Sequence, residues 1–308
     1  MQAQDGRSTL SAAALQRGAA TWLATGISIE EMQISIAIDV RGLGCHPSDM
    51  QKLQVARRRD KLQQHIDRFL SAATNFLGSS FDSDDMTDPG LVDGLGEDDY
   101  SDIEDHVPSP SESPTDFKPE CFILPLPSNL GTDKCKDLGL TNVINDEVAL
   151  RVGQANDALH AIRVNLAYKA VIFRNSMRLA KSQAGTTRAW SQVRSVERVV
   201  SYNARIYSKC RQQLVKLGAD KLLEKYQPLI KADLKASSAV ADPNARGQRN
   251  SILPWFWTLD IQGDSTSSDW MTECKIRLLS AGRLLTNLLP CSLSHSLAPP
   301  QSPSTALG

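Results

Sequence analysis

The side chains with the clearest chemical potential are Lys and Arg residues between positions 163 and 216, where twelve cations accompany a single acid, Glu197. On a helix, residues three, four, seven or eleven positions apart lie on one side. The spacing predicts two basic lines, one made of Arg163, Arg174, Arg178 and Lys181, the other of Arg194, Arg198, Arg205, Lys209 and Lys216. Such lines could bind a nucleic-acid backbone without reading its sequence. The alternative is a solvated face whose long stems cover apolar neighbours.

A strongly acidic segment lies elsewhere in the same chain. Residues 79–116 hold thirteen Asp or Glu and no Lys or Arg, although the net charge of all 308 residues is only −1. The segment is rich in Asp, Ser, Gly and Pro and has few large apolar residues, so we predict an acidic disordered linker over 78–116. Its charge adds a third interpretation, in which the acidic segment screens the basic helices.

Residues that could support catalysis or metal binding are not spaced for it. The six cysteines form no C-x-x-C pair, and the five histidines are scattered. The Gly-Leu-Gly sequence at 42–44 lacks the Gly-Lys-Ser/Thr ending of a phosphate loop. We therefore predict that the chain is not an enzyme and has no catalytic residue, metal ligand, cofactor or small-molecule substrate.

Apolar periodicity indicates helices that would position the basic lines. Residues 10–77 are predicted to form a helical hairpin, broken at Gly42-Leu-Gly44 and restarted near Pro47. Its second helix has the heptad spacing of a packed seam, carried by Leu62, Ile66, Phe69, Ala73 and Phe76. Residues 117–140 follow as an extended strap, because Pro125 and Pro127 are expected to exclude a helix there.

A longer basic helical hairpin is predicted over 141–218. Its first helix has a seam of Val148, Val152, Ala155, Leu159, Ile162 and Leu166, at alternating gaps of four and three. The turn is expected at Gly185, with Thr187 as the cap of the second helix and Gly218 closing that helix. Residues 219–289 are predicted to be short helices and an aromatic turn region, in which Trp255-Phe-Trp257 is a hydrophobic plug. Residues 290–308 are predicted to be a disordered tail.

Together these elements predict an all-α protein made of two long antiparallel helical hairpins with coiled-coil-like seams. The seams could close within the chain or allow self-association, and DNA is the second candidate partner. No stretch approaches the ~18 apolar residues of a membrane-spanning helix, so we predict no membrane partner. We expect an intracellular location, and a nuclear one if the chain binds DNA.

Several stretches resemble fungal KDZ (Kyakuja-Dileera-Zisupton) transposase-like proteins, in the helical region after the catalytic domain. They are WLATGISIEEMQ at 22–33, TTRAW at 186–190, LGAD at 217–220, LKAS at 234–237, GQRNSILPWFW at 247–257 and SDWM at 268–271. The resemblance covers most of 21–271, interrupted by the acidic segment. It implies an RNase-H-like nuclease core upstream of this region, so no catalytic residue carries over to this chain.

The C-terminal part departs from the family pattern. A long charged helix would follow Trp270-Met271 in the family, whereas Cys274 here leads into Leu-rich and then Ser/Pro-rich sequence. Three hypotheses follow from the sequence. The chain is a non-catalytic assembly or interaction module derived from a transposase-like protein, a sequence-independent nucleic-acid binder through the basic hairpin, or a degenerate transposon-derived fragment with no independent function.

Overall fold

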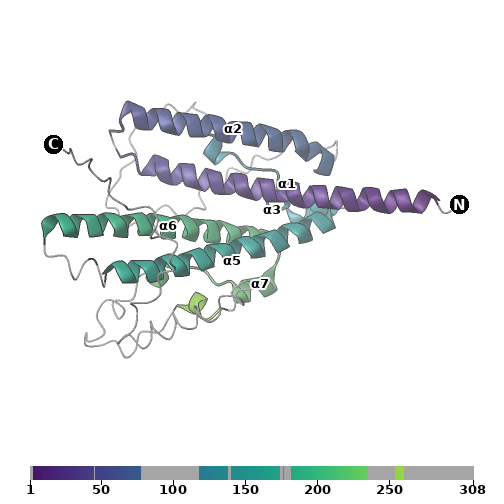
Figure 1. The fold of residues 1–308 in the computed structure, drawn as a ribbon. Helices are drawn as coiled ribbons and strands as arrows, with labels where there is room; N and C mark the ends of the chain where they lie inside the picture. Colours follow the sequence, from purple (N-terminus) through teal and green to yellow (C-terminus); the bar gives the residue numbers. More distant parts are fainter. Residues whose placement is uncertain are drawn as a thin grey trace, which may run out of the picture.

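The computed structural model describes the backbone at residues 3–44, 46–77, 118–137, 140–173, 176, 182–234 and 254–259, and side chains from residue 18 onward. Every regular element in these ranges is helical, which confirms the all-α prediction. Figure 1 shows the long helices lying side by side as two hairpins. The predicted linker at 78–116, the part of the predicted region 219–289 that follows residue 259, and the tail at 290–308 lie outside the described residues.

The first hairpin consists of α1 (Ala3–Arg41) and α2 (Asp49–Leu77). Gly44 takes a positive φ of 68° in the connection, a conformation that favours glycine. Ser48 then caps α2, because its hydroxyl accepts from the Gln51 N–H while the Gln51 side chain accepts from the Ser48 N–H. The predicted seam of α2 is buried at Leu62, Ile66, Phe69 and Ala73, and half-buried at Phe76.

The segment that follows is not wholly extended. It contains a 3-10 turn at Pro119–Cys121 (η3) and two short helices, α3 (Pro127–Leu130) and α4 (Thr132–Asp137). The prediction that prolines exclude a helix is therefore wrong at 127–130. Pro127 begins α3, where its missing N–H costs nothing and its fixed φ suits the first helical position. Pro125 lies outside any helix, as predicted.

The second hairpin consists of α5 (Thr141–Ile172) and α6 (Gln183–Lys216). Helix α6 begins earlier than predicted, because the Ser182 hydroxyl accepts from the Gly185 N–H at 3.1 Å and caps the helix in place of Thr187. Gly218 ends α6 with a φ of 69°, as predicted. The seams of α5 and α6 face each other within one chain, so they are closed inside the molecule.

Helix α1 joins two hydrophobic cores. Ile29 and Ile36 pack with α2 and the segment around Leu124, whereas Ile34 packs with α5 and α6. Because α1 is covered from two sides, nine of its fifteen residues between Trp22 and Ile36 are buried, whereas Ala24, Thr25 and Ser28 remain exposed. The two hairpins are therefore parts of one packed unit, as the neighbouring positions of α1 and α6 in Figure 1 also show.

The chain after α6 closes one end of the second core. Helix α7 (Asp220–Lys225) is followed by 3-10 turns at Lys231–Leu234 (η5) and Trp255–Trp257 (η7). Phe256 and Trp257 are buried against α5 and α6. The aromatic turn is thus a hydrophobic plug, as the sequence predicts.

Two helical glycines should respond in opposite ways to alanine. A Cβ built on Gly26 would lie 2.8 Å from carbons of both Phe69 and Leu126, which are buried, whereas one on Gly153 meets nothing within 4 Å. We expect Gly153→Ala to stabilise the protein by about 0.5–1 kcal/mol. Gly26→Ala should destabilise it by about 1–3 kcal/mol, because overpacking outweighs the propensity gain. Urea unfolding of the two variants checks this, and a stabilised Gly26→Ala would refute the close packing.

Candidate functional site

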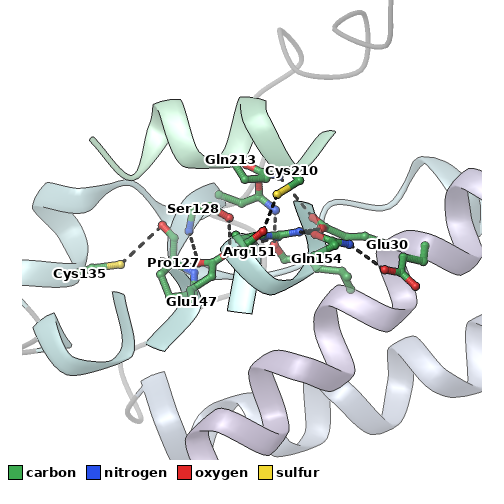
Figure 2. Close-up of polar contacts among 12 residues, drawn as sticks. Glu30, Pro127, Ser128, Cys135, Glu147, Arg151, Gln154, Cys210 and Gln213 are labelled. Atoms are coloured by element: carbon green, nitrogen blue, oxygen red, sulfur yellow. Dashed lines mark hydrogen bonds and ion pairs between the residues drawn. The ribbon is translucent and has the colours of Figure 1, made fainter. Parts of the chain in front are cut away.

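The most concentrated group of polar side chains in the described part of the chain is a buried cluster between the hairpins, centred on Arg151 of α5 (Figure 2). Arg151 Nη1 lies 2.6 Å from Glu30 Oε2 of α1, and Arg151 Nη2 lies 3.1 Å from Glu147 Oε1, one turn earlier on α5. The three side chains are between 0 and 5% exposed. Two carboxylates therefore share one guanidinium away from solvent.

Neighbouring groups donate further hydrogen bonds to the carboxylates. The Ser128 N–H and hydroxyl donate to Glu147 at 2.9 and 2.6 Å. The Gln213 amide of α6 donates to Glu30 Oε1 at 3.3 Å and to the side-chain oxygen of Asn129 at 3.0 Å. The cluster thus connects α1, α3, α5 and α6, and Figure 2 shows Glu30, Ser128, Glu147 and Gln213 around Arg151.

The electrostatics of the cluster keep Arg151 charged. Burial acts to lower its pKa, but the adjacent carboxylates of Glu30 and Glu147 outweigh that effect and hold the pKa above its ordinary value. A guanidinium held in this way has no proton to give at any physiological pH. What the cluster can do is fix the two hairpins in register, because removing Arg151 would leave two buried carboxylates without a partner cation.

Two cysteines lie near the cluster with thiols that are hard to ionise. Burial raises the pKa of Cys210 to about 12 and that of Cys135 to about 11. The Cys210 thiol donates to the Arg151 carbonyl oxygen at 2.9 Å. The Cys135 thiol lies 3.8 Å from the Pro127 carbonyl oxygen. Neither is suited to be a nucleophile, because the thiolate is the reactive form.

We therefore predict that Cys135 and Cys210 resist alkylation in the folded protein. At pH about 8, a thiol of pKa near 12 is ionised in roughly one molecule in ten thousand. Cys121 is exposed and serves as the internal reference. Iodoacetamide labelling mapped by mass spectrometry should mark Cys121 in native buffer, and Cys135 and Cys210 only in denaturant. Rapid native labelling of Cys210 would show that this part of the core is open.

The one residue of the first predicted basic line that the structure describes does not lie on the surface. Arg163 is 1% exposed, and its guanidinium donates to the carbonyl oxygens of Phe256 and Leu259 of the aromatic turn, each at 2.8 Å. Its role is to tie the plug to α5, so the assignment of Arg163 to a nucleic-acid-binding face is corrected here. Arg174, Arg178 and Lys181 lie outside the described residues.

The second predicted line is divided by burial. Arg194 and Arg198 are exposed, Lys209 and Lys216 are half-buried, and Arg205 is 9% exposed. Arg205 is therefore also removed from the predicted face. The line runs beside the seam of α6, and α1 packs against α6 as well as α5, so a third helix can cover part of a flank that periodicity leaves open.

Sequence reasoning missed the cluster around Arg151. One signal was available, because Glu147 and Arg151 form an i, i+4 pair in line with Ile144 and Ala155, which are buried. Charged residues within an apolar line indicate a buried ion pair or a break in the seam. Glu30 could not have been matched to them from the sequence, since it lies on another helix 121 positions before Arg151.

Neither the remaining geometry nor comparison with known proteins identifies a family. Among the described residues, no three His, Cys, Asp or Glu side chains lie together in a way that could hold a metal ion. No helix in that part of the chain is long and apolar enough to cross a membrane. Searches against family models, curated proteins and solved structures found no match.

Proposed function

We propose that this chain is a non-catalytic helical interaction module, of the kind expected downstream of a transposase's nuclease core. The observation that carries the proposal is the pairing of Glu30 and Glu147 with Arg151. Two buried carboxylates close together could bind a metal or transfer a proton if they were free. Here one guanidinium pairs with both carboxylates, and Ser128 donates to both oxygens of Glu147, so the arrangement favours a structural role.

The residues that carry the family resemblance support the same proposal. Trp22 is 5% exposed and stacks on Phe69 with ring centroids 4.8 Å apart. Phe256 and Trp257 are buried in the other core. These three positions are packing residues, so the likeness at them favours a shared helical framework and implies no shared reaction.

Assembly with a second copy is the direct test of an assembly role. Because the seams of α5 and α6 are closed within the chain, contact between copies has to use outer faces or an exchanged hairpin. Light scattering on the full chain should give a mass above that of one chain, with a melting temperature that rises with protein concentration. The mass of a single chain at every concentration would contradict self-assembly.

Nucleic-acid binding by α6 is the second candidate function. Arg194 and Arg198 are exposed, lie one turn apart, and form no ion pair or hydrogen bond within the described part of the chain. An electrophoretic shift assay over a salt series should show binding at low salt that an Arg194→Glu/Arg198→Glu variant loses. Equal binding by that variant would exclude this face of α6.

A further inference from the structure

The outward side of α2 has a further line of cations, separate from the two basic lines predicted between positions 163 and 216. Arg57, Lys61 and Arg68 are exposed and lie at gaps of four and seven residues. Within the described ranges none of them takes part in an ion pair or hydrogen bond. They span about 16 Å at 1.5 Å per residue, and we call these three side chains the α2 stripe.

Uncharged polar side chains continue the α2 stripe in both directions. Exposed residues fall on the same side of the helix at alternating gaps of three and four, and they are Gln54, Gln64, Ser71 and Asn75. No acid lies on this line. The nearest, Asp60 and Asp67, flank the line. Each precedes a cation by one residue, and Asp60 also follows Arg57 by three. Within the described ranges neither forms an ion pair with a cation of the α2 stripe. The line is a row of hydrogen-bond donors and positive charges.

The inner side of α2 holds the α2 stripe in place. Leu62, Ile66 and Phe69 are buried against α1 and the segment around Leu124. Two neighbouring arginines add polar anchors, because Arg58 is ion-paired with Asp39 and Arg59 donates to both carboxylate oxygens of Glu120 at 3.0 and 3.1 Å. The outward cations therefore lie on a helix whose inner side is held by packing and by ion pairs.

The composition of this face decides which polyanion suits it. Among the described residues, the exposed large hydrophobics of α2 are Met50 and Leu53, both before the first cation of the α2 stripe. A protein interface is usually centred on apolar or aromatic anchors and depleted in Lys. A helix lying on a membrane needs an apolar face where this one is cationic. A phosphate backbone is bound by polar, wet and strongly basic surfaces with no such anchor.

We propose that the outward face of α2 binds nucleic-acid phosphates through Arg57, Lys61 and Arg68, independently of base sequence. The proposal goes beyond an interaction role for the helical framework. It places nucleic-acid binding on α2, whereas the second candidate function places it on α6. Gln54 and Gln64 donate further hydrogen bonds along the same line.

The test uses the full chain, so that the thirteen acids of 79–116 are present in every variant. Fluorescence anisotropy with labelled duplex and single-stranded DNA is measured over a salt series. Arg57→Gln/Lys61→Gln/Arg68→Gln should weaken duplex binding by about tenfold or more at low salt and reduce the slope of log K against log salt by roughly 2.7, or 0.9 for each lost contact. Single-stranded DNA should show a reduction of roughly 2.1 in slope, or 0.7 for each contact.

A matched control separates the α2 stripe from net charge. Lys134, Lys221 and Lys225 are exposed on α4 and α7, and Lys134→Gln/Lys221→Gln/Lys225→Gln removes the same charge from other helices. This control should bind nearly as the natural sequence does, and both triple variants should keep its urea midpoint. Equal losses in the two variants, or no binding by the natural sequence at low salt, would overturn the proposal.

Two further outcomes distinguish the alternatives. If Arg194→Glu/Arg198→Glu abolishes binding and the α2 variant does not, the α2 assignment fails and the α6 candidate stands. If vesicles of anionic phospholipid compete as strongly as DNA at equal charge, the surface is not selective for nucleic acid and the proposal fails. Loss of DNA binding in the α2 variant alone, without vesicle competition, supports it.

Discussion

Replacing Arg151 with methionine is expected to lower the free energy of unfolding by about 3–5 kcal/mol, the range found when one partner of a buried ion pair is removed. The reason is that Glu30 and Glu147 would remain buried without the guanidinium that lies 2.6 and 3.1 Å from them. Methionine retains much of the side-chain volume, so the loss of stability reflects the missing charge and not a cavity. Urea unfolding followed by circular dichroism measures it.

Two companion variants make this result specific. Arg194→Met alters an exposed arginine on α6 and should change stability by no more than about 0.5 kcal/mol. The triple variant Glu30→Gln/Glu147→Gln/Arg151→Met removes all three charges and should recover part of the loss, because neutral replacements no longer leave a buried charge unpaired. If Arg151→Met alone costs less than about 1 kcal/mol, the cluster does not join the hairpins as described.

Replacing Trp22 with alanine should also cost about 3–5 kcal/mol, the usual range for a buried aromatic residue. The indole stacks on Phe69 and Phe76, with centroids 4.8 and 5.4 Å away, and its N–H donates to the Phe69 carbonyl oxygen at 3.3 Å. Truncation would remove these contacts and leave a cavity between α1 and α2.

Trp190 is the matched control for this substitution. It is 44% exposed, and its aromatic contact is an edge-on one with Phe173 at 6.1 Å. Trp190→Ala should therefore cost about 1 kcal/mol, close to the value of one aromatic pair. Similar losses for the two tryptophans would show that the packing of α1 on α2 is looser than the structure indicates.

The parts of the fold that periodicity encodes could be predicted from the sequence. The seam of α2 repeats through Leu62, Ile66 and Phe69, and that of α5 through Leu159 and Ile162, and all five are buried. The glycine at position 218 correctly predicted where α6 ends, but the start of α6 was not predicted correctly. Ser182 and Thr187 are both suitable caps, and nothing local decides between them.

The candidate site depended on contacts that no local pattern contains. Arg163 and Arg205 have the spacing of surface cations, yet the structure buries both. A period gives the angle of a residue around its own helix, but not which flank another element covers. Glu30 meets Arg151 across 121 positions for the same reason. The α2 stripe was readable from spacing, but its lack of acid partners became visible only with the contacts of Arg58 and Arg59 known.

We expect this chain to bind DNA without cleaving it, and one assay tests both expectations directly. End-labelled duplex and single-stranded DNA are incubated with the full chain in Mg²⁺ or Mn²⁺ at low salt, and each sample is analysed both for complex formation and for strand length. The account predicts a retarded complex whose DNA strands remain intact. Metal-dependent cleavage that is lost in a Glu30→Gln/Glu147→Gln variant would contradict it, because the carboxylates assigned to holding the hairpins together would then be catalytic.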